Sequence, residues 1–454
     1  MPDLVPLPGS ERSELPGASP TTTPLDDSQV ITVTVLLRRR AEVPTELVQG
    51  PETITTDELG ERYGADPADA QLVAEVLGSY GLNVTETQLA SRRMMVSGTI
   101  AAMQAAFGTT LTTVTSPHPD GSGNVRHRYR TGSLSVPARL SGIITAVLGL
   151  DDRPQARPQF RRGPASGAFG ARTTADQEDG TGAVAAATAG PLTAPQVASF
   201  YQFPAGTDGT GQTVAIIELG GGYTASDLST YFSGLGLSVP SVTAVGVDGA
   251  SNSPGQSADG EVELDIEVVG GVAPGAVQIV YFAANTDQGF IDAISEAVHA
   301  TPSPIAVSIS WGQSEDQWSA QSRTAMDEAF ADAATLGVTV TVAAGDNGSS
   351  DDPNSTSGVH CDFPASSPNA LACGGTKLAG NTSSFAITSE VVWNELANNE
   401  GAGGGGVSDV FPLPSYQANA GVPTSAATSG SGRGVPDVAG NADPVTGYLV
   451  VVDG

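Results

Sequence analysis

Residues 277–283 read VQIVYFA, a nearly continuous apolar run that is typical of a β-strand buried on both faces. Segments with helical spacing separate this run from its neighbours, for example EVELDIEVVGG (261–271) and GFIDAISEAVHA (289–300). Repetition of strand, helix and strand predicts a doubly wound parallel sheet, an α/β fold. The other runs of this kind are TVAIIEL (213–219), SVTAVGV (241–247), PIAVSIS (304–310) and VTVTVAA (338–344).

Polar residues follow several of these predicted strands. Glu218 ends one run, the turn Ser310-Trp311-Gly312 follows a second, and Asp346 follows a third. Open parallel sheets bind ligands beyond the carboxyl ends of their strands. We therefore expect a functional site that these side chains share.

The segment SADGEVELDIEVVGGVAPGA (257–276) holds the densest group of carboxylates. Glu261 and Asp265 are four residues apart, so a helix places them on one face. Two acids at this spacing can share a proton, and one of them can then act as a general base at low pH. A solvated acidic helix face is the alternative interpretation.

Asp346 stands in a Gly-Asp-Asn-Gly turn directly after a buried strand. It is either an ordinary turn residue or a carboxyl group exposed at the active end of the sheet. The acidic loop that follows does not have the spacing of an EF-hand. Histidine occurs only four times, so the sequence predicts no zinc site and offers few candidates for a Ser-His-Asp triad.

The N-terminal part of the chain has a different pattern. Residues 1–28 are rich in Pro, Ser, Thr and acids, which predicts a disordered tail. Residues 29–155 mix strands and helices and predict a compact α+β domain, with a last helix after Pro137. Residues 156–190 are Arg-bearing and then small-residue-rich, which predicts an exposed linker with a processing site. The α/β domain then occupies residues 191–454.

Composition excludes several classes of protein. The 454 residues carry 49 acids against 19 basic residues, a net charge of −30, which opposes nucleic-acid binding. Residues 191–454 hold 28 acids against three cations, a net charge of −25 that suits acidic surroundings, high salt or simple solubility. No apolar run is long enough to span a membrane, and the first residues show no signal peptide. Cys361 and Cys373 either form one bridge or remain two thiols.

Several motifs together resemble the sedolisin family of serine-carboxyl peptidases, including its kumamolisin-type precursors. The resemblance spans residues 29–454 and keeps the order of the family's motifs. In the N-terminal part it rests on TVTVLLRR (32–39) and RYRTGSLSVPARL (128–140). In the α/β domain it rests on VAIIELGGGY (214–223), DGEVELDIEV (259–268), SISWG (308–312), AAGDNG (343–348), DFPASSPNALACGGT (362–376) and GRGVPDVAGNADPVTGY (432–448).

The resemblance implies a subtilisin-like fold, a ferredoxin-like propeptide that inhibits its own peptidase, and cleavage of peptide bonds in acid. By position, Glu261 matches the general base, Asp265 its supporting acid and Asp346 the oxyanion-hole carboxyl. The resemblance implies substrate-binding roles for Glu218, Trp311 and Asp362. It also implies a secreted monomer that binds one calcium ion.

The family's nucleophile is the Ser of a Gly-Thr-Ser motif that follows the region matched by 432–448. Gly374-Gly375-Thr376 is similar, but Lys377 follows it. We therefore expect the nucleophile and the calcium ligands to lie beyond residue 454, with the sequence incomplete at its C-terminus. The alternatives are an inactive peptide-binding or folding module, and a nucleotide-binding α/β enzyme, for which ELGGGY (218–223) is weak evidence.

Overall fold

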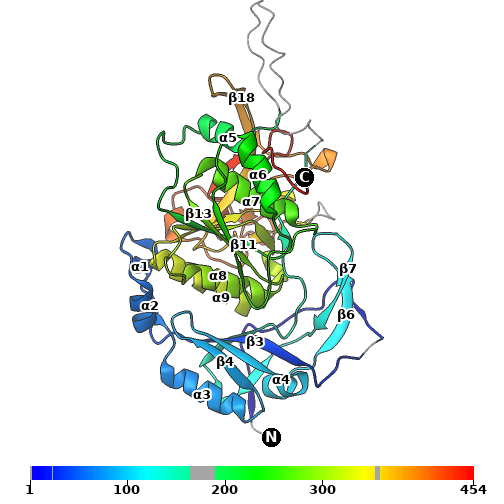
Figure 1. Cartoon of the computed structure of the whole chain (residues 1–454). Helices are drawn as coiled ribbons and strands as arrows, with labels where there is room; N and C mark the ends of the chain where they lie inside the picture. Colours follow the sequence, from blue (N-terminus) through cyan, green and yellow to red (C-terminus); the bar gives the residue numbers. More distant parts are fainter. Residues whose placement is uncertain (1–2, 23, 164–189, 353–357) are drawn as a thin grey trace, which may run out of the picture.

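The structure is a computed structural model that describes residues 3–22, 24–163, 190–352 and 358–454. Its C-terminal unit (residues 191–454) is built on an eight-stranded sheet (Figure 1), and only the β18–β19 pair in it is antiparallel. The strand order is β12 (Ser241–Gly246), β13 (Val277–Phe282), β11 (Thr213–Glu218), β14 (Ala306–Ile309), β16 (Thr339–Ala343), β18 (Leu371–Asn381) and β19 (Ala386–Val392), and β22 (Val438–Asn441) also pairs with β18. This arrangement confirms the predicted doubly wound parallel sheet.

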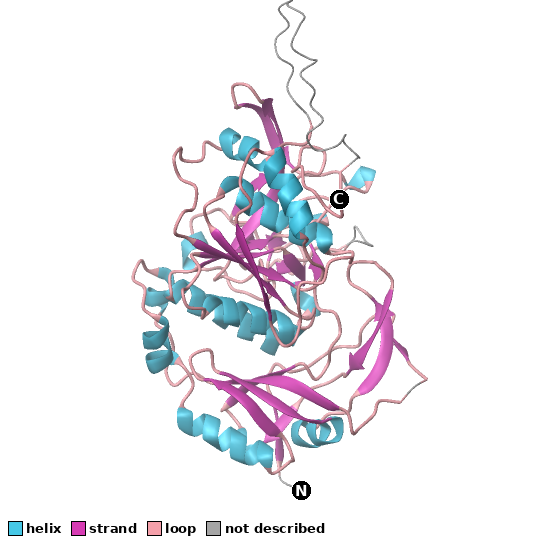
Figure 2. Ribbon diagram, in the orientation of Figure 1, coloured by secondary structure: helices cyan, strands magenta, loops and turns pink. Residues whose placement is uncertain are grey.

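Helices cover both faces of this sheet because successive strand residues point in opposite directions. Ile216 and Val280 pack with α6 (Ala225–Gly234) and α7 (Asp259–Val272), whereas Ile217 belongs to the core formed with the helices of the opposite face. The helices of that opposite face are α8 (Asp287–Val298) and α9 (Ala320–Thr335). Figure 2 shows the sheet between these two helical layers.

The N-terminal unit (residues 29–155) has an antiparallel sheet in the order β4-β5-β3-β9 and two helical connections, the order of a ferredoxin-like domain. Val33, Val35 and Leu37 pack against its own helices, while Leu36 lies in the core of the C-terminal unit. The sheet is therefore buried on both faces, and one face rests on α8 and α9 (Figure 1). The elements are β3 (Val30–Leu37), α3 (Pro67–Gly78), β4 (Asn83–Gln88), β5 (Arg93–Thr99), α4 (Ile100–Phe107) and β9 (Ile144–Leu148).

The prediction of a disordered tail over residues 1–28 is wrong for the residues that the structure describes. Strand β1 (Leu4–Pro6) pairs with β8 (Ser135–Pro137), and β2 (Ser19–Pro20) pairs with β6 (Thr112–Pro117). Leu7 is buried in the N-terminal core. We call residues 4–12 the N-terminal strap, because they join both units. The helix expected after Pro137 is only a 3-10 turn (Ala138–Leu140), since β9 then forms the fourth strand of the sheet.

The linker predicted over 156–190 is folded where the structure describes it. Residues 156–163, here called the connecting segment, include the short strand β10 (Arg157–Pro158), which pairs antiparallel with β15 (Trp311–Ser314). The predicted processing site has no assigned position, and residues 164–189 lie outside the described residues. Cys361 and Cys373 are free thiols, Cys361 buried and Cys373 partly buried. No helix of the described residues is long and apolar enough to cross a membrane.

Candidate active site

Helix α7 brings the predicted acid pair together. Glu261 and Asp265 lie one turn apart and both are buried, with 1% and 9% of their surface exposed. Asp259, at the start of the helix, accepts hydrogen bonds from the backbone N–H groups of Gly222 and Gln256 at 2.9 and 3.1 Å. These bonds fasten the loops beside the first turn and so fix the position of Glu261.

Both carboxyl oxygens of Glu261 are buried and have no hydrogen-bond partner among the described residues. Burial raises the pKa of Glu261 well above its usual range, and the charges of Asp265, Glu218 and Asp346 raise it further. Burial also raises the pKa of Asp265 to about 7. Two buried carboxyl groups therefore lie one turn apart on α7, and a negative charge on Asp265 raises the pKa of Glu261.

Ser310 and Trp311, which follow β14, contact the acids of the site. The Ser310 hydroxyl lies 2.9 Å from each of the two carboxyl oxygens of Asp265. Trp311 Nε1 donates to Glu218 Oε2 at 2.9 Å, and both residues are almost fully buried. Burial, and next the charge of Asp265, raise the pKa of Glu218 well above normal. Glu218 and Trp311 thus support the site from behind its wall.

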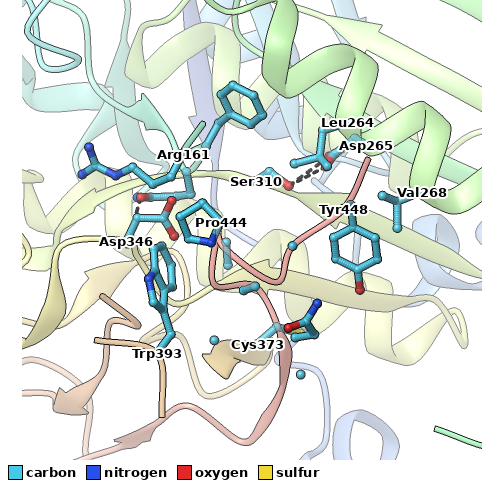
Figure 3. Close-up of a pocket in the computed structure, with 18 of the residues that line it drawn as sticks. Arg161, Leu264, Asp265, Val268, Ser310, Asp346, Cys373, Trp393, Pro444 and Tyr448 are labelled. Carbon is cyan, nitrogen blue, oxygen red and sulfur yellow. Dashed lines mark hydrogen bonds between the residues drawn. The ribbon is translucent and has the colours of Figure 1, made fainter. Parts of the chain in front are cut away.

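Asp346 follows β16 and faces the same cavity as Asp265, on the opposite side of the view in Figure 3. Burial raises its pKa to about 6, although the nearby Arg161 and Arg157 act against the shift. Below that pH the carboxyl group carries a proton and can donate a hydrogen bond. The cavity has a volume of about 1150 Å³.

Asp362 lies fully buried behind Gly312 in the wall of this region. A Cβ atom on Gly312 would lie 2.0 Å from Asp362 Oδ1, so only glycine fits there. Burial and the charge of Asp351 raise the pKa of Asp362 well above normal. Asp351 accepts a hydrogen bond from Ser314 at 2.9 Å and forms an ion pair with Arg157 of the connecting segment.

The connecting segment runs through the site. The backbone N–H of Gln159 donates to the Ser310 carbonyl at 2.8 Å. Its side chain donates to Asp362 Oδ2 at 3.0 Å and accepts from the backbone N–H of Asp346 at 3.2 Å. Phe160 lies over Gly260, where a Cβ would be only 2.5 Å from its ring. The connecting segment therefore lies along the cavity and forms part of its lining.

Asp265 and Asp346 line the cavity, while Glu261, Glu218, Trp311 and Asp362 lie within or behind its wall. Thr376, in the stretch that is similar to the nucleophile motif, lies on β18 and donates to Glu390 at 2.8 Å. Within the described ranges, no group of three or more His, Cys, Asp or Glu side chains is arranged to hold a metal ion. The described residues therefore show no cluster of carboxylates for the calcium ion that the resemblance implies.

Asp351 and the connecting segment belong to the site although no sequence motif indicates them, and Ser310 is indicated only by its place at the end of a predicted strand. The resemblance gives a role to Trp311 beside it but none to Ser310. The segment that contains Arg157, Gln159 and Arg161 has few large apolar residues, which predicts a linker. Its order comes from bonds to the C-terminal unit, which no local pattern reveals.

Comparison with known proteins gives the family. Kumamolisin from Bacillus sp. (strain MN-32) is 48% identical over 447 residues, covering 95% of this chain and 77% of that protein. This chain belongs to the sedolisin family of serine-carboxyl peptidases. Residues 19–153 match the family model of the pro-kumamolisin activation domain, and residues 241–432 match that of the subtilase family. The chain is therefore a precursor in which an activation domain precedes a subtilisin-like unit.

Two further sedolisin comparisons agree. Sedolisin from Pseudomonas sp. (strain 101) is 30% identical over 403 residues, which cover 85% of this chain and 64% of that protein. The structure of Pseudomonas sedolisin, a serine-carboxyl proteinase complexed with pseudo-iodotyrostatin, is 31% identical with a TM-score of 0.52. That match covers 58% of this chain and 74% of the solved chain.

Proposed function

We propose that this protein is the precursor of a serine-type endopeptidase that acts in acid. Glu261 is the general base, Asp265 supports it, and Asp346 stabilises the oxyanion. The observation that carries this proposal is the carboxyl group of Glu261, whose two buried oxygens have no partner among the described residues. A buried acid without a partner is costly, so a hydroxyl donor next to it would be favourable. The serine nucleophile is part of this proposal and is not assigned to a numbered residue.

The chemistry follows from these positions. The serine hydroxyl attacks the peptide carbonyl carbon and passes its proton to Glu261. The carbonyl oxygen becomes an oxyanion that accepts a hydrogen bond from protonated Asp346. Glu261 then returns the proton to the leaving amine, and water hydrolyses the acyl-enzyme by the same route in reverse.

Low pH supplies the proton that Asp346 needs and removes charges that raise the pKa of Glu261. Asp346 donates only when protonated, which its pKa of about 6 allows in acid. Protonation of Asp265, Glu218 and Asp346 removes the charges that raise the pKa of Glu261. The proposal also requires Glu261 to be ionised when the serine attacks, and a hydroxyl that donates to Glu261 favours this form because it lowers the pKa of the carboxyl group.

The connecting segment supports self-inhibition by the propeptide. Its backbone pairs with Ser310 and β15, and its side chains contact Asp346 and Asp362, so it occupies the positions that a peptide substrate needs. Asp362 has one buried oxygen without a hydrogen-bond partner among the described residues, and we propose that it contacts substrate side chains after the segment has left. Secretion and calcium binding remain proposals from the family resemblance.

Expression from the complete reading frame tests the proposal. After incubation at pH 3–4 the protein is expected to lose about 190 residues and to cleave peptides, and Glu261→Gln is expected to lower kcat by at least about 100-fold. Peptide binding without turnover would instead support an inactive binding module.

A further inference from the structure

Ser310 contacts the acid pair from the strand that carries the cleft. Its hydroxyl lies 2.9 Å from both Oδ1 and Oδ2 of Asp265, so one donor faces the middle of the carboxyl group. Figure 3 shows this contact at the edge of the cavity. Among the described residues, Ser310 is the hydrogen-bond donor to the Asp265 carboxyl group. Its hydroxyl therefore fixes the orientation of that group.

The backbone of the same residue binds the peptide in the cleft. The Ser310 carbonyl accepts the N–H of Gln159 at 2.8 Å, next to the antiparallel pairing of Arg157 and Pro158 with β15. Ser310 therefore contacts the cleft peptide through its carbonyl and Asp265 through its hydroxyl, so a displacement of the peptide at Gln159 acts on the residue that orients Asp265.

Asp265 belongs to a group of buried acids at the site. Glu261 lies on the same helix, Glu218 on β11, and Asp346 after β16, while Arg157 and Arg161 of the connecting segment are the cations that act on Asp346. The hydroxyl of Ser310 acts against the effect of burial on Asp265, since its hydrogen bond lowers the pKa of that carboxyl group.

We infer that Ser310 is a positioning residue of the proposed peptidase: its hydroxyl orients the carboxyl group of Asp265, and its carbonyl couples that group to the backbone of the bound peptide. This inference rests on the proposed function. Neither the family models nor the sequence analysis assigns Ser310 a role.

The test compares Ser310→Ala with Ser310→Thr, which retains a hydroxyl, in protein expressed from the complete reading frame. Ser310→Ala is expected to lower kcat about 10-fold with KM changed less than twofold, because one hydrogen bond to a carboxyl group is lost. The acidic limb of the pH–rate profile should move to higher pH by about half a unit or more, since the pair loses its donor. Ser310→Thr should restore both values. Ser303→Ala, an exposed serine whose hydroxyl contacts only the Ala300 carbonyl, is the control.

An unchanged kcat and pH profile in Ser310→Ala would overturn the inference while leaving the proposed function intact. Complete loss of activity in both variants with the fold retained would also overturn it, because that result indicates direct attack by Ser310. A second measurement does not need activity. In the 454-residue chain with ¹³C-labelled aspartate carboxyl groups, the signal that disappears in Asp265→Asn should titrate at higher pH in Ser310→Ala, and an unchanged titration contradicts the inference.

Discussion

Arg12→Ala is expected to loosen the contact between the two units of the precursor. Arg12 Nη2 lies 2.6 Å from Asp287 Oδ2 at the start of α8, and both side chains are only 3% exposed. Arg12 Nη1 also donates to Gln155 at 2.9 Å. Removal of one partner from a buried ion pair costs about 3–5 kcal/mol. We take the lower value, about 3 kcal/mol, because Asp287 keeps hydrogen bonds from Ser322 and from the N–H of Gln288.

Hydrogen–deuterium exchange on the 454-residue chain measures this effect. A loss of about 3 kcal/mol corresponds to roughly 150-fold faster opening of the interface. The faster exchange should appear in the first turns of α8 and α9, since Gln321 N donates to Gly9 of the N-terminal strap at 2.9 Å.

Arg38→Ala provides the matched control, because Arg38 is 53% exposed and pairs with Asp69 of its own unit. That pair is worth less than about 1 kcal/mol, so exchange at the interface should stay within about fivefold of wild type. Equal exchange in Arg12→Ala and Arg38→Ala would refute the role of the N-terminal strap as an anchor.

Other predictions concern carboxyl groups in the C-terminal unit. Asp346→Asn keeps a hydrogen-bond donor at every pH, so its remaining activity should no longer fall as pH rises through about 6. Asp346→Ala should lose activity by at least about 100-fold at all pH values. A wild-type pH profile in Asp346→Asn contradicts the oxyanion role. Glu267, on the other face of α7, has a pKa raised by burial to about 9 from its usual 4.5. The folded chain favours the protonated form of Glu267. The stability that depends on this proton is therefore complete below about pH 4.5 and is lost as pH rises toward 9. Glu267→Gln should therefore stabilise the chain by up to about 3 kcal/mol at pH 7 and by almost nothing at pH 4; urea unfolding at the two pH values measures this, and an equal effect at both would exclude it.

The sequence predicts the C-terminal sheet well because burial on both faces leaves a local signal. VQIVYFA and three of its companions became β13, β11, β14 and β16, whereas SVTAVGV (241–247) became β12, an edge strand that is mostly exposed. The spacing of Glu261 and Asp265 on one helix face followed from helix geometry. The ends of parallel strands then gather the polar residues at one edge, which is why Asp346 and Ser310 line one cavity.

The parts that were mispredicted depend on distant partners. The N-terminal strap is polar and Pro-rich, yet Arg12 is buried against Asp287, 275 residues away in sequence. The connecting segment has little apolar surface of its own and is ordered by Asp351, Asp362 and β15. The stretch after Pro137 becomes a strand because β3 needs a partner on its second edge. None of these pairings has a local pattern.

Glu261→Gln in protein expressed from the complete reading frame tests the central claim most directly. The matched control is Glu263→Gln, which changes a buried acid on the same helix that accepts a hydrogen bond from Thr224 rather than contacting the cleft. At pH 4 we predict that Glu261→Gln lowers kcat/KM for a peptide substrate by at least about 100-fold, while Glu263→Gln stays within about threefold of wild type. Wild-type turnover by Glu261→Gln would show that another group takes the proton.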